Sequence, residues 1–100
     1  MKLGILVNTD RHPEDIEKLT VIALAKGHEV DIFAMDSGTR LLELRQFTGL
    51  SMLKGVRMSY CDHSAGEHKV KKEDIPAAIV CGSQFNNAAM VHDSDRVLVL

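Results

Sequence analysis

Short apolar runs alternate with segments of helical periodicity along the whole sequence, and this alternation limits the fold more than any other feature. The connections between the runs are too long for hairpin turns and carry apolar residues at helical spacing. Strands joined in this way pair in parallel, with right-handed crossovers that place helices on both faces of the sheet. The pattern therefore predicts an α/β fold, a three-layer α/β/α sandwich with a five-stranded parallel sheet. The expected strands are Leu3–Val7, Glu29–Ala34, Val56–Tyr60, Ala77–Cys81 and Arg96–Leu100.

The first helix has the clearest signals at both ends. Pro13 stands where helices accept proline, and Glu14 and Asp15 follow in the first turn, where the helix dipole favours negative charge. Gly27 supplies a left-handed stop at the other end. Three further helices are expected: one capped by Ser37 or Thr39 and ended near Gly49, a short one from Asp62 to about Lys69, and one with Ser83 as its N-cap.

Composition restricts the class of protein. A chain of 100 residues with 45% hydrophobic content can bury one core but not two, so we expect a single domain over residues 1–100. Its 12 basic and 14 acidic residues leave a net charge of −2, which favours neither nucleic acid nor an anionic membrane as a partner. No run approaches the roughly 20 apolar residues of a membrane helix, and the first run is too short for a secretion signal. Two cysteines are too few for a disulfide scaffold, so a cytoplasmic protein with reduced thiols is expected.

Polar residues and both cysteines follow the carboxyl ends of the expected strands. In open parallel sheets, ligands bind at this edge, where loops and helix N-termini gather. Cys61 and Cys81 end consecutive strands at equivalent positions, so they would come close together if those strands were neighbours about 4.8 Å apart. The segments at this edge are Asn8–Asp10, Met35–Ser37, Cys61–His63 and Cys81–Ser83.

Cys61 is the first candidate for chemistry because it stands where a strand passes into a helix. Free backbone N–H groups and the positive end of the helix dipole stabilise a thiolate at such a position. His63 would add a positive charge or act as a base, whereas the carboxylate of Asp62 would oppose the thiolate. Cys61 and His63 are thus the candidate catalytic residues. The alternative is that Cys61 is a small buried hydrophobic residue, as most cytosolic cysteines are.

Cys81 ends an apolar strand and is expected to be a packing residue. Thiolate and imidazole groups in this part of the sequence could also ligate a metal, but Cys61 and His63 do not have zinc-finger spacing, and no metal site is predicted. No glycine-rich nucleotide motif is present, so no cofactor is predicted either. The residues that would have supplied the metal ligands are Cys61, His63, His68 and Cys81.

Six segments, which together span essentially the whole chain, carry a resemblance to a known family: Lys2–Val7, Gly27–Phe33, Gly55–Cys61, Lys71–Ile75, Gly82–Gln84 and Ser94–Leu98. Together they resemble the DsrE/DsrF-like family, whose members include sulfur-relay proteins. The resemblance implies a five-stranded parallel sheet in the order 4-3-2-1-5, in which the third and fourth strands are neighbours. The segment from Asp62 to Ile75 is short for the helix of longer members, and Cys81 is not part of the recognised motif.

The resemblance also implies a function for Cys61. In sulfur-relay members, a cysteine just after the third strand accepts sulfane sulfur as a persulfide, and Cys61 occupies that position. The implied partners are sulfur donor and acceptor proteins, and the implied assembly is a homo-oligomer, a trimer or hexamer. Two alternatives remain: a non-catalytic oligomeric module that binds a small ligand or metal, and a dithiol redox protein that uses Cys61 and Cys81 as a pair.

Overall fold

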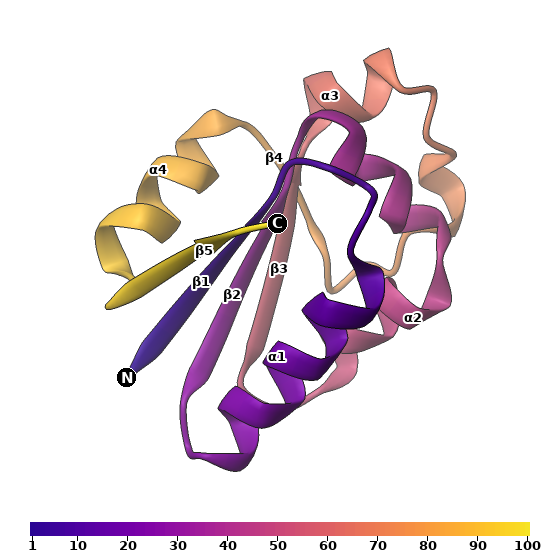
Figure 1. Ribbon diagram of the computed structural model, residues 1–100. Helices are drawn as coiled ribbons and strands as arrows, with labels where there is room; N and C mark the ends of the chain where they lie inside the picture. The colour runs from indigo at the N-terminus through magenta and orange to yellow at the C-terminus, as the bar shows by residue number, and fades with distance from the viewer.

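A sheet of five parallel strands lies at the centre of the computed structural model, which describes residues 1–100 (Figure 1). The strand order is β4-β3-β2-β1-β5, and every neighbouring pair is parallel, so the expected fold and order are confirmed. The strands are β1 (Lys2–Val7), β2 (Glu29–Ala34), β3 (Val56–Cys61), β4 (Val80–Gly82) and β5 (Arg96–Val99). None of the helices is long and apolar enough to cross a membrane.

The fourth strand is shorter and begins later than the apolar pattern predicts. Residues from Ala77 to Ile79 form a turn, in which the Ile79 N–H donates to the Pro76 carbonyl at 3.0 Å. The strand then pairs with β3 from Val80 to Gly82. Ile79 is nevertheless buried in the main core, so its apolar character reflects packing rather than strand pairing.

Helix α1 (Pro13–Ala25) begins and ends where its sequence signals predict. Pro13 opens the helix, and Gly27 beyond its end has a φ of 83°, a left-handed conformation that glycine adopts without steric cost. Ile16 and Ala23 are buried against the sheet, together with Thr20, whose hydroxyl donates to the Ile16 carbonyl at 2.7 Å. Thr20 can therefore occupy the apolar face because its one polar group is satisfied within the helix.

The connection from β2 to β3 does not contain the continuous helix expected between Ser37 or Thr39 and Gly49. It consists of two 3₁₀ helices, η1 (Asp36–Glu43) and η2 (Gly49–Met52), on either side of the one-turn helix α2 (Arg45–Thr48). Leu44 is extended, with φ −106° and ψ 126°, and separates η1 from α2. Neither expected cap is made, since the Thr39 hydroxyl instead donates to the Asp36 carbonyl at 2.7 Å.

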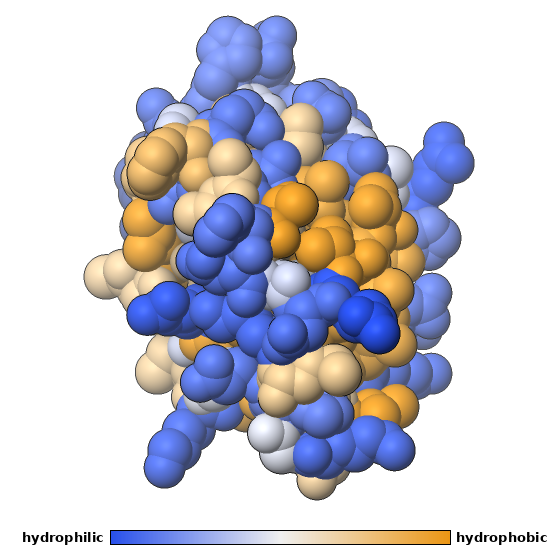
Figure 2. Space-filling view, turned by 90° about the vertical axis from the view of Figure 1, so that its left-hand side faces the viewer, coloured by the Kyte–Doolittle hydropathy of each residue, from blue (hydrophilic) through white to orange (hydrophobic).

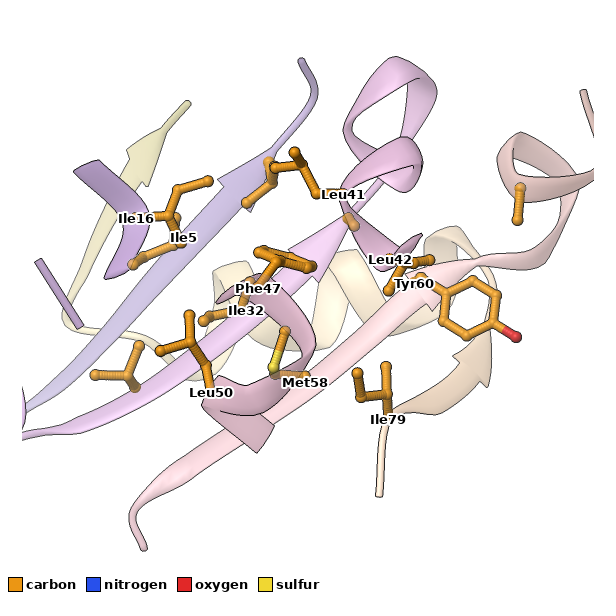
Figure 3. Packing of buried hydrophobic residues seen from close by; sticks show 14 of the residues in the cluster. Ile5, Ile16, Ile32, Leu41, Leu42, Phe47, Leu50, Met58, Tyr60 and Ile79 are labelled. Atoms are coloured by element: carbon orange, nitrogen blue, oxygen red, sulfur yellow. The ribbon is translucent and has the colours of Figure 1, made fainter. Parts of the chain in front are cut away.

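The two faces of the sheet are covered unequally (Figure 1). Helices α1 and α2 pack over one face, and their buried side chains form the main core with alternate residues of the strands (Figure 3). Helix α4 (Gln84–Asp93) packs on the other face, where Met90 joins Phe33 and Cys61 in a smaller cluster. The sheet thus separates Tyr60, in the main core, from Cys61, in the smaller cluster.

Candidate functional site

Cys61 lies at the carboxyl edge of the sheet, where β3 passes directly into α3 (Asp62–Glu67). It is the N-cap of α3, and its sulfur accepts a hydrogen bond from the Ser64 N–H at 3.5 Å. The position is therefore the one that the sequence predicts, at the junction of a strand and a helix. At this junction, N–H groups with no partner inside the helix are available to the sulfur.

The Cys61 side chain is almost completely covered, with an exposed fraction of 5%. It packs with Phe33 and Met90 on the α4 face of the sheet, and Leu6 and Met35 lie against this cluster. The expectation that Cys61 is a small buried side chain is correct as far as burial goes. Burial alone would make the thiol inert, so its hydrogen bonds decide what it can do.

Burial and hydrogen bonding act in opposite directions on the pKa of Cys61. Burial is the largest single influence and raises the pKa, because a thiolate loses hydration in an apolar site. Hydrogen bonds from the side chain and backbone of Ser64, the Gln84 side chain and the His63 backbone together outweigh burial, and the pKa lies below its usual value. Cys61 therefore combines a covered sulfur with surroundings that favour the thiolate.

His63 helps to lower the pKa of Cys61 through its backbone, which donates a hydrogen bond to Cys61. Its imidazole is 82% exposed, and Nε2 lies 3.4 Å from Oε1 of Glu67, one turn further along α3. Proton transfer by the imidazole, which the sequence suggests, stays a prediction.

The carboxylate of Asp62 is engaged by groups other than Cys61. Lys72 forms an ion pair with it and, together with a hydrogen bond from Cys81, lowers the pKa of Asp62. Because the Lys72 ammonium neutralises this carboxylate locally, Asp62 opposes the Cys61 thiolate less than the sequence suggests.

The two cysteines lie on neighbouring strands but on opposite faces of the sheet. Cys61 pairs with Gly82, and Cys81 pairs with Tyr60. Side chains alternate between faces along a strand, so Cys81 shares the face of Tyr60, with which it forms a hydrogen bond. The expectation of two adjacent thiols is wrong, because the register differs by one residue. Cys81 is also exposed rather than packed.

Mild oxidation is therefore expected to leave both thiols of one chain unlinked. A disulfide requires Cβ atoms that face each other, and side chains on opposite faces of a sheet point apart. Intact mass without reductant, combined with thiol counting after unfolding, measures this directly. A monomer that has lost two hydrogens through a Cys61–Cys81 disulfide would contradict the strand register.

The structure gives no support to a metal centre at this edge. No three His, Cys, Asp or Glu side chains are grouped where they could hold a metal ion together. The metal-binding alternative that Cys61, His63, His68 and Cys81 suggest in the sequence therefore has no geometric basis.

Two side chains near Cys61 are not identified by the sequence patterns as part of the site. Gln84 opens α4 and donates a hydrogen bond to Cys61, and Met35 follows β2 and packs against the Cys61 cluster. Both lie in or beside segments that the sequence places at the carboxyl edge. What the sequence does not provide is the direction of their side chains, which depends on the strand register and on the start of α4.

The comparisons agree with the fold just described. The model of the DsrE/DsrF-like family matches residues 1–100. Among solved structures, YchN from E. coli has a TM-score of 0.73 and 14% identity, over 99% of this chain and 97% of that chain. MTH1491 from Methanobacterium thermoautotrophicum, described as a protein of unknown function, has a TM-score of 0.64 and 12% identity, over 99% of this chain and 98% of that chain. The search of curated proteins finds no match.

Proposed function

Because the chain belongs to the DsrE/DsrF-like family, we propose that it is a small sulfur carrier that relays sulfane sulfur as a persulfide on Cys61. One observation carries the proposal. Cys61 lies at the junction of β3 and α3, in a set of hydrogen bonds that lowers its pKa and so favours the nucleophilic form. Cys81 lies on the other face of the sheet and shares none of these donors.

The transfer consists of two thiolate displacements. The Cys61 thiolate attacks the terminal sulfur of a donor persulfide, forming a new S–S bond while the donor's S–S bond breaks and the donor leaves as a thiolate. The hydrosulfide proton stays on the transferred sulfur. An acceptor thiolate then attacks that sulfur and releases the Cys61 thiolate. Both steps exchange one S–S bond for another, so neither requires an external oxidant or reductant.

The hydrogen bonds from Ser64, His63 and Gln84 serve the second step as well as the first. They stabilise Cys61 as the thiolate, which is the group that leaves when the acceptor takes the sulfur. A thiol of lower pKa leaves faster. The same donors therefore favour delivery of the sulfur, and the expected partners are donor and acceptor proteins that bear thiols. A cytoplasmic location, which the sequence leads us to expect, would keep such thiols reduced.

Loading with sulfur tests the proposal. The protein is incubated with a low-molecular-weight persulfide, and intact mass measures the gain of one sulfur atom. Cys81→Ser is expected to load like the wild type and Cys61→Ser not at all, since serine keeps the shape of the side chain but lacks the nucleophile. His63→Ala keeps the backbone donor and removes the imidazole, so slower loading is expected if the imidazole transfers a proton; a wild-type rate would show that His63 acts only through its backbone. Equal loading of Cys61→Ser and the wild type would refute the proposal.

We also propose that the protein works as a homo-oligomer, a trimer or hexamer. Large apolar side chains are exposed on both outer helices, including Ile22 of α1 and Phe85 and Val91 of α4. Figure 2, viewed from the α4 side, shows apolar surface on either side of a polar band. Light scattering should give three or six times the 11.0 kDa of one chain, and a monomer at working concentration would exclude this assembly.

A further inference from the structure

Two side chains from separate elements meet beside the buried Cys61 thiol. Met35 lies directly after β2, and Gln84 is the first residue of α4. The Gln84 Nε2 lies 3.8 Å from the Met35 Sδ, and the Gln84 side chain also donates to Cys61, against whose cluster Met35 packs. Gln84 and Met35 thus form a bridge next to Cys61, a residue that is only 5% exposed.

Strand pairing and a helix cap fix the backbone that leads to Gln84. Gly82 pairs with Cys61 in the sheet, which brings the start of α4 next to the thiol. Ser83 then forms a capping box, in which its hydroxyl accepts from the Phe85 N–H at 3.2 Å and its own N–H donates to Asn86 Oδ1 at 3.0 Å. The Gln84 side chain, by contrast, is exposed to solvent. It can change its rotamer without moving the helix.

We propose that Gln84 is a positioning residue for the Cys61 thiolate and that Gln84 and Met35 form a cover that must move aside before Cys61 can meet a second sulfur atom. This inference rests on the proposed function and concerns how that site is controlled. Thiol–disulfide exchange depends on access to the attacking sulfur, and the covered thiol has little room for a donor persulfide.

Opening the cover would change the reactivity of Cys61 as well as its exposure. When Gln84 moves away, the thiolate loses one of its hydrogen-bond donors. A thiolate with fewer donors is more basic and therefore a stronger nucleophile. The covered state thus stores a stabilised thiolate, and the open state presents a more reactive one to the partner.

Alkylation of Cys61 by iodoacetamide across a range of pH tests this inference, in a Cys81→Ser background that leaves a single thiol. Gln84→Ala should raise the apparent pKa of Cys61, because a donor to the thiolate is lost. It should also raise the limiting rate at high pH severalfold, because the cover is incomplete. Met35→Ala should raise the limiting rate with a much smaller pKa change, and Gln84→Glu should raise the pKa further, because a carboxylate repels the thiolate.

Gln46→Ala is the matched control, because Gln46 is an exposed glutamine that donates to Glu17 away from this site. It should leave both the pKa and the limiting rate of Cys61 unchanged. A faster rate in Gln84→Ala without a rise in pKa would overturn the positioning role, and unchanged limiting rates in Gln84→Ala and Met35→Ala would overturn the cover. Alkylation needs no sulfur donor, so these failures are distinct from a failure of Cys61 to accept sulfur.

Discussion

Replacing Phe47 by alanine is expected to lower the free energy of unfolding by about 3–5 kcal/mol. Phe47 is 1% exposed and lies among Ile32, Leu50 and Met58 in the main core (Figure 3). Truncation removes the buried ring and leaves a cavity that the surrounding strands and short helices can fill only in part. Since domains of this size are stable by roughly 5–15 kcal/mol, the loss would be a large fraction of the total.

Phe85→Ala is the matched control for this prediction. Phe85 is also a phenylalanine, but it is 78% exposed on α4. Its truncation should therefore change the free energy of unfolding of the isolated chain by less than about 0.5 kcal/mol. Urea unfolding at a dilution at which the chain is monomeric gives the stability of each variant from the midpoint of the transition, if the slope is unchanged. Equal losses for Phe47→Ala and Phe85→Ala would contradict the placement of the main core on the α1 face.

Gly38→Ala is expected to destabilise the chain by about 1–3 kcal/mol, because a larger side chain here meets backbone rather than a flexible side chain. A Cβ at Gly38 would clash with the carbonyl oxygen of Val7. That oxygen accepts from the Met35 N–H at 2.9 Å, so the shift needed to relieve the clash would also move Met35. We therefore expect faster alkylation of Cys61 in this variant.

Gly49→Ala serves as the control for Gly38→Ala. Gly49 has helical φ and ψ of −61° and −21°, and a Cβ there would meet nothing within 4 Å. Alanine should be neutral or stabilising by up to about 1 kcal/mol. Thermal or urea unfolding distinguishes the two variants. A Gly38→Ala protein as stable as Gly49→Ala would show that η1 does not approach the end of β1 as closely as described.

Much of the architecture could be predicted because its signals are local. Pro13 and Gly27 mark the ends of α1, and Ser83 marks the start of α4, since each residue acts through its own backbone geometry or nearest N–H groups. The β2–β3 connection could not be predicted in the same way. Leu41, Leu42 and Phe47 are buried as a helical pattern implies, but Leu44 is extended and exposed and divides the segment. Tertiary context overrides helix propensity here.

In the candidate site, too, the features with local signals could be predicted and those that depend on long-range pairing could not. The strand-end position of Cys61 follows from the end of an apolar pattern and is correct. The separation of Cys61 from Cys81 depends on a one-residue difference in register between β3 and β4, and no pattern within either strand specifies it. Gln84 reaches Cys61 because Gly82 pairs with Cys61 in the sheet and because the capping box of Ser83 fixes the first turn of α4. This arrangement joins distant parts of the chain, and the sequence alone does not reveal it.

Mapping the added sulfur in the wild-type protein shows which of the two thiols carries it. After loading with a persulfide donor and alkylation, trypsin separates the two cysteines, with Cys61 in the peptide Met58–Lys69 and Cys81 in the peptide Glu73–Arg96. The alkylated persulfide is expected on Met58–Lys69. Sulfur found on Glu73–Arg96, with Met58–Lys69 carrying only the ordinary alkylated thiol, would contradict the proposed role of Cys61.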